Sequence, residues 1–260
     1  MTVYDVARAL PGIEELRDHC RGLAMLDAVL SPEWDGRYYS FGKDTASMRD
    51  GQGDEYRIVF SPAGAYVEGF AHEAPMSPWA NLDQPEVWPG VLDEVPDDFR
   101  PYISMAEDGY APDVTACLWR EPADPAWRVG TIDFPTWGDG TPDGADELFG
   151  LLVDRSAEAY AEWAADYYGT DLDVEAVRHV LALRPLTPEV VAALNPEVEL
   201  ADLAEDIAGI RYPTQRELRE LVDWLEEEYC PTTAAEKAAA RAELAELDAE
   251  HERRRALRRE

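Results

Sequence analysis

The 260-residue chain carries 55 acidic against 23 basic side chains, a formal net charge of −32, and 46% of its residues are hydrophobic. Eight Trp, twelve Tyr and six Phe supply enough apolar area for a folded core, which excludes disorder of the whole chain. No window approaches about 18 uncharged apolar residues, and the first residues lack the layout of a signal peptide, so we expect neither a membrane span nor secretion by that route.

The N-terminal half begins with a helical pattern and continues with alternating, aromatic-rich segments. Apolar residues from Ile13 to Leu30 recur at helical spacing, which predicts an amphipathic helix over residues 13–30. Residues 61–64, Ser-Pro-Ala-Gly, have the composition of a hairpin connection. The predicted strands form a sheet of about five, mostly antiparallel, and span residues 37–41, 56–60, 65–70, 114–119 and 127–134.

The C-terminal half is predicted to be helical because the hydrophobic period changes after Phe134 from two to about 3.6. Tyr160, Trp163, Ala164 and Tyr167 share one helical face. Helix starts are indicated by Thr187-Pro188 and by two capping-box pairs, Thr214 with Glu217 and Thr233 with Glu236.

Sheet followed by helices predicts an α+β fold, with one domain over residues 1–230 that is sheet-rich in 1–136 and helical in 137–230. Residues 231–260 form a charged, Ala-rich tail that we expect to be helical, to project and to be a candidate for self-association. Residues 234–260 contain seven acids and seven bases, so the whole charge excess lies in residues 1–233.

Charge and cysteine usage bear on partners, compartment and cofactors. Residues 1–233 are acidic enough to repel phosphate, which disfavours direct nucleic-acid binding and favours a basic protein partner. The alternative explanation of the acidity is that it maintains solubility. Cys20, Cys117 and Cys230 form no CxxC pair, which fits a reducing cytoplasm. The segment Gly51-Gln52-Gly53 precedes a strand and so cannot cradle phosphate at a helix start, and no cofactor is expected.

A loop after the third predicted strand carries a base, an acid and a hydroxyl in His72, Glu73 and Ser77. An acid-base or metal-assisted hydrolase could centre on this loop if the sheet brought Asp54, Glu55 or Asp133 near it. The chain has neither an HExxH nor a GxSxG motif. The alternative is therefore a rigid loop in which His72 and Glu73 bond to the backbone.

Asp139 and Asp143 resemble the start of a calcium loop. Counted from Asp139, however, position three is Thr141 and position twelve is Gly150 instead of the bidentate Glu. No metal site is therefore expected here, and Asp143 is interpreted as the cap of a helix that begins near Ala145.

Tryptophans in predicted loops suggest a binding surface. Trp79, Trp88 and Trp137 lie outside the predicted strands and could form an exposed patch, whereas core packing is the ordinary role of any one Trp. Aromatic residues surrounded by acids are typical of a surface that binds a basic partner.

Several short segments resemble a family of uncharacterised bacterial proteins. They are GDEY at residues 53–56, FSPAG at 60–64, GF at 69–70 with HE at 72–73, MSP at 76–78 and WPGVLDEVP at 88–96. The resemblance continues through CLWR at 117–120 and DG at 143–144 to RPLT at 184–187, and the tail after Cys230 is less typical of the family. No established activity accompanies the family, so the resemblance implies no function.

Charge without a catalytic motif favours a cytoplasmic, non-enzymatic binding protein, of the immunity or antitoxin kind, that recognises a basic protein. The hydrolase is one alternative. The other is a nucleic-acid mimic that occupies a basic groove through rows of carboxylates, for which a solvated helix face is the ordinary explanation. The candidate rows are Glu158, Glu162, Asp166 and Glu226, Glu227, Glu228.

Overall fold

The computed structural model describes residues 1–33, 36–80, 85–104, 112–137 and 140–220. The chain divides into two compact units, Met1–Pro213 and Thr214–Glu260. The predicted tail over residues 231–260 and the predicted domain end at residue 230 lie outside the described residues.

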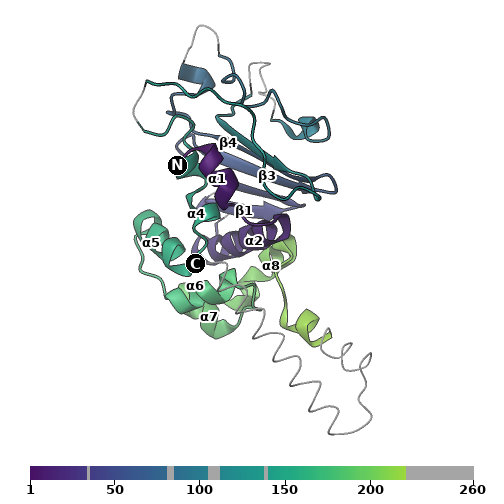
Figure 1. Cartoon of the computed structure of the whole chain (residues 1–260). Helices are drawn as coiled ribbons and strands as arrows, with labels where there is room; N and C mark the ends of the chain where they lie inside the picture. The colour runs from purple at the N-terminus through teal and green to yellow at the C-terminus, as the bar shows by residue number, and fades with distance from the viewer. Residues whose placement is uncertain (34–35, 81–84, 105–111, 138–139, 221–260) are drawn as a thin grey trace, which may run out of the picture. The chain divides into compact units, whose positions relative to one another are not determined.

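A five-stranded antiparallel sheet lies at the centre of the first unit, and its strands neighbour one another in chain order. This sheet and the helices after it confirm the predicted α+β fold (Figure 1). Tyr56, Ile58 and Phe60 are buried on one sheet face, as their alternation predicts. The strands are β1 (Tyr39–Gly42), β2 (Thr45–Arg49), β3 (Glu55–Ser61), β4 (Gly64–Phe70) and β5 (Ala116–Arg120).

Two strand predictions need correction. The strand β2 was not predicted, because in Thr-Ala-Ser-Met-Arg only Thr45 is β-branched and no residue is aromatic. The predicted strand over residues 127–134 is wrong, since only Arg128 makes a β-bridge, to Trp119. Beyond it the backbone bonds to side chains instead: the hydroxyl of Tyr4 donates to the carbonyl of Gly130 at 2.9 Å and accepts from the amide of Ile132 at 2.8 Å.

The long helix α2 (Ile13–Leu30) has the bounds that its spacing predicts, and it is the middle layer of the unit. It contacts β1 and β2 on one side and α6 (Val174–Leu181), α7 (Pro188–Leu194) and α8 (Ala204–Ile210) on the other (Figure 1). Gly22 permits the approach to α6, because a Cβ there would lie 3.2 Å from the Cα of Leu181. Burial on both sides explains why more than one stripe of α2 is apolar.

The remaining helices begin where cap residues indicate. Ser156 caps α5 (Ala157–Tyr168), Asp173 caps α6 and Thr187 caps α7, each accepting a bond from a backbone amide of the first turn. In the second unit, Thr214 and Glu217 form the predicted capping box. The helices α1 (Val3–Ala9), α3 (Ala145–Leu148) and α4 (Gly150–Val153) complete the described set. In the part of the chain that the structure describes, no helix combines the length and apolar character that a membrane crossing requires.

Candidate functional site: the acidic end of the sheet

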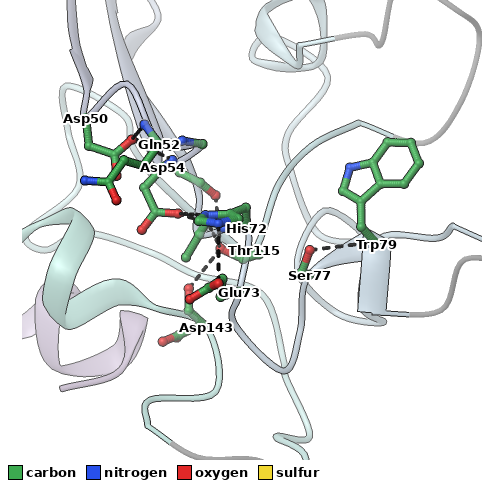
Figure 2. Close-up of polar contacts among 12 residues, drawn as sticks. Asp50, Gln52, Asp54, His72, Glu73, Ser77, Trp79, Thr115 and Asp143 are labelled. Atoms are coloured by element: carbon green, nitrogen blue, oxygen red, sulfur yellow. Dashed lines mark hydrogen bonds and ion pairs between the residues drawn. The ribbon is translucent and has the colours of Figure 1, made fainter.

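The loop between β2 and β3 is held in shape by one aspartate. The Oδ1 atom of Asp50 accepts bonds from the backbone amides of Gln52, Gly53 and Asp54 at 2.7, 3.0 and 2.9 Å (Figure 2). Three amides on one oxygen fix the turn, which is the local bonding that aspartate favours in loops. The second oxygen, Oδ2, has no donor among the described residues.

This ordered loop places Asp54 against the residue that follows β4. The Oδ1 atom of Asp54 accepts from the backbone amide of His72 at 2.8 Å and lies 2.6 Å from its Nδ1 (Figure 2). Strand register brings the two together, because Glu55 pairs with Phe70. A Cβ on Gly53, whose φ is +125°, would lie 3.0 Å from the His72 ring, so the ring needs glycine beneath it.

Two further acids complete this end of the sheet. Glu73 has a side chain that is 88% exposed, and its Oε1 lies 3.8 Å from the Nε2 of His72. Glu55 is directed to Arg49 instead, at 3.1 Å. We call Asp50, Asp54, Glu55, His72 and Glu73 the acidic end of the sheet. Of the four residues predicted as catalytic candidates, the structure joins Asp54, His72 and Glu73, whereas Glu55 is engaged by an arginine.

The electrostatics of His72 follow from these contacts. The hydrogen bond that the His72 ring donates to Asp54 raises the pKa of His72 above its ordinary value of 6.5, and the charges of Glu73 and Asp50 act in the same direction. Its side chain is 38% exposed, so solvent reaches the ring. An Asp-His pair of this kind can hold or move a proton at Nε2, provided that a reacting group lies within reach.

No such group is assembled among the described residues. The hydroxyl of Ser77 is buried and accepts from the backbone amide of Trp79, and Figure 2 shows it away from His72. The carbonyl of Asp133 accepts from the Trp88 indole. In the described parts of the chain, no group of three His, Cys, Asp or Glu residues is placed to hold a metal ion.

The two residues weighed as calcium ligands have different outcomes. Asp139 lies outside the described residues. Asp143 is fully buried and accepts from the amide of Ala145 at 3.1 Å, as predicted for a cap, and also from the amide of Val3 at 2.7 Å. Burial raises its pKa. Its carboxylate therefore binds the starts of α1 and α3 together.

A small pocket of about 80 Å³ lies beside the acidic end, on the sheet face opposite α2. Its arginines are paired, Arg49 with Glu55 and Arg57 with the buried Glu68. Pockets for organic ligands usually enclose roughly 300 Å³ or more. It is lined by Ser47, Arg49, Glu55, Tyr56, Arg57, Glu68, Gly69, Phe70, Ser104 and Asp113.

The three predicted surface tryptophans lie in two places. Trp88 and Trp137 form an edge-to-face pair with ring centroids 6.3 Å apart, and Trp137 is 57% exposed. Trp79 is exposed as well, and its indole donates to Asp113 at 2.7 Å.

A second exposed aromatic group was not predicted as a surface. Tyr38, just before β1, packs against Trp163 and Tyr167 of α5, with centroid distances of 4.8 and 4.9 Å. We call Tyr38, Trp163 and Tyr167 the aromatic patch. The helical spacing of Trp163 and Tyr167 was interpreted as a core face, although Tyr167 is 43% exposed. The acid directly before Tyr167 in the sequence, Asp166, was the available signal.

No protein-family model, curated protein or solved structure matches the chain. The resemblance to a family of uncharacterised bacterial proteins stays a prediction.

Proposed function

We propose that the chain is a non-enzymatic, cytoplasmic binding protein that recognises a basic protein, as an immunity or antitoxin protein does. One observation carries the proposal: four carboxylates, of which Glu55 and Glu73 are exposed, gather at the acidic end of the sheet, where the Asp54–His72 pair meets no nucleophile and no metal-binding group among the described residues. Such an end is suited to attract a cationic surface and lacks the partners that hydrolysis requires.

The net charge of −32 supports the same proposal at long range. A body of one sign steers an oppositely charged partner toward it and raises the association rate, and salt weakens this effect over a Debye length of about 8 Å. The same field repels nucleic acid, which makes a basic protein the fitting partner.

The two alternatives have less support. A hydrolase centred on His72 needs a hydroxyl or a water-activating metal at the ring, and Ser77 is engaged by Trp79. A nucleic-acid mimic needs free rows of carboxylates, and in the row on α5 Glu158 is paired with Arg178. The second row lies outside the described residues.

The test is co-purification from the host followed by reconstitution. We expect a basic protein to be recovered at about 50 mM salt, and its association rate with the purified chain to fall as salt rises toward about 500 mM. An unrelated basic protein of similar charge is the control for unspecific attraction. Recovery of no basic protein, or binding no tighter than to the control, would overturn the proposal. The variant His72→Ala should keep the partner bound, because the acids and not the ring attract a basic surface.

A further inference from the structure

We propose that the aromatic patch, together with Asp50, is the point at which an arginine side chain of the basic partner docks. This inference rests on the proposed function and adds to it a location and a side-chain chemistry. Three observations support the inference: the arrangement of the three rings, the place of Asp50 after the residue that pairs with Tyr38, and the exposure of Tyr167.

The three rings of the aromatic patch pack against one another. Trp163 and Tyr167 lie nearly parallel, with centroids 5.2 Å apart and an interplanar angle of 11°, and Tyr38 meets both of them edge to face. Trp163 also packs on the buried Tyr160, which connects the aromatic patch to the core. Tyr167 is the most exposed of the three, at 43%, whereas Tyr38 and Trp163 are partly buried.

Asp50 follows the residue that pairs with Tyr38. The amide of Arg49 donates to the carbonyl of Tyr38 at 2.9 Å, so the loop that carries Asp50 begins one residue beyond this backbone bond. Burial is the first cause that raises the pKa of Tyr38 to about 12, and the negative charge of Asp50 is the second. Burial also raises the pKa of Tyr167, and the charges of Asp27 and Asp50 add to this shift. Since the loop amides occupy Oδ1, Oδ2 remains for a partner.

The negative charge of acids near the aromatic patch favours a cation as the group that docks there. Glu162 and Asp166 are exposed on α5, the helix that carries two of the rings, and Asp54 adds its charge near Tyr38. A cation over an aromatic face gains electrostatic attraction from the ring, and this attraction is strengthened by a carboxylate within reach. An apolar partner would have to desolvate these acids without compensation.

Among cations, the geometry fits arginine better than lysine. A guanidinium is planar and weakly hydrated, so it can stack on Tyr167 while its N–H groups point sideways to Asp50. A lysine ammonium is a compact, strongly hydrated charge that satisfies the carboxylate without covering the ring. The patch thus predicts discrimination between two side chains of equal charge.

Three fluorescent peptides test the inference on the full chain by anisotropy. They have one basic sequence and differ at a central residue, which is arginine, lysine or the neutral isostere citrulline. We expect the arginine peptide to bind most tightly and the citrulline peptide least tightly. Tyr167→Ala should raise the Kd of the arginine peptide about two- to fivefold, as expected for an exposed cation–aromatic contact. Asp50→Asn, which keeps an oxygen for the loop amides, should weaken it comparably at low salt.

Matched variants separate this surface from the rest of the molecule. Trp137→Ala removes an exposed ring of the tryptophan pair and tests that pair as the rival surface. Asp97→Asn removes a fully exposed acid elsewhere and should leave the Kd unchanged. Thermal unfolding of each variant checks that the fold is retained.

The outcomes distinguish the inference from the proposed function. If the arginine peptide binds no tighter than the citrulline peptide, or if Trp137→Ala weakens it and Tyr167→Ala does not, the inference is wrong. Capture of a basic protein that is insensitive to Tyr167→Ala would likewise overturn the inference alone. Failure of the whole chain to capture any basic protein overturns the proposed function.

Discussion

Carboxylates in the interior and at the acidic end of the sheet differ in what they bind. In the interior, Asp27, Glu68 and Asp143 are almost fully buried, and each accepts bonds from residues distant in the chain. At the acidic end, Asp50 bonds within its own loop and Glu73 is exposed. Interior carboxylates therefore stabilise the fold, whereas Glu73 and the Oδ2 atom of Asp50, at the end, remain available to a partner.

Asp27 shows how much an interior carboxylate can connect. From α2 it accepts the backbone amides of Tyr38 and Tyr39, both at 2.6 Å, and the hydroxyl of Tyr160 at 3.2 Å. It thereby links the central helix to the start of β1 and to α5. The same contacts set the position of Tyr38, so the interior acid supports the aromatic patch from beneath.

The largest effect is expected from Asp27→Ala. The substitution leaves two backbone amides and a hydroxyl without an acceptor, and each unsatisfied buried group costs about 1 to 3 kcal/mol. We expect the free energy of unfolding, measured with denaturant, to fall by about 3 kcal/mol or more. Asp27→Asn keeps an oxygen for the amides and is the control, with a much smaller change at neutral pH. Equal losses in both variants would show that the charge, and not the acceptor, matters.

The pH dependence of stability should distinguish the two regions next. Burial raises the pKa of Asp27 from 3.8 to about 6, so between these values the native state holds a proton that the unfolded state has lost. Stability from this group therefore falls as pH rises through about 4 to 6 and is level above that window. A shift of about two units corresponds to about 3 kcal/mol.

The measurement compares wild type with Asp27→Asn, because the repulsion among the other acids is common to both and largely cancels. We expect the variant to gain stability relative to wild type as pH rises from about 4 to about 6. A constant difference across this range would show that Asp27 titrates normally in the folded protein.

A smaller loss is expected from Asp143→Ala. The change removes the acceptor for the amides of Val3 and Ala145, at the starts of α1 and α3, and should cost about 2 kcal/mol in a denaturant titration. Calcium at millimolar concentration should leave the melting temperature of the wild type unchanged, because this carboxylate is already occupied by the two amides. A melting temperature that rises with calcium would contradict this assignment.

Local patterns account for what could be predicted of the fold. Helical spacing determined α2, and the caps Thr187 and Asp143 were identified from residue type and position. The strand β2 was missed because its residues are small or polar and owe their pairing to β1 and β3 on either side. The helix α1 was missed as well, so the bond from Val3 to Asp143 could not be foreseen.

The site was predictable only where a hairpin connects its parts. Asp54 and His72 flank β3 and β4, so the register of one hairpin brings them together, and the sequence suggested this approach. The aromatic patch joins the residue before β1 to a helix far along the chain. Its spacing is identical to that of a core face, and only the fold reveals that Tyr167 stays exposed.

The smallest effect on stability is expected from the Asp54–His72 pair, and it tests whether the acidic end contributes to folding at all. Because the hydrogen bond to Asp54 raises the pKa of His72 above 6.5, its stabilisation is complete below that value and is lost as pH rises through the folded-state pKa. The ring is 38% exposed, so solvent screening reduces the contribution to less than about 1 kcal/mol.

In a titration of the histidine ring resonances by NMR, Asp54→Asn should lower the pKa of His72 toward 6.5. If the pKa of His72 stayed the same in Asp54→Asn, the hydrogen bond to Asp54 would not be the cause of its shift. A large fall in the free energy of unfolding of Asp54→Asn would instead show that this pair stabilises the fold as the interior carboxylates do. The distinction between the two regions would then not hold for the Asp54–His72 pair.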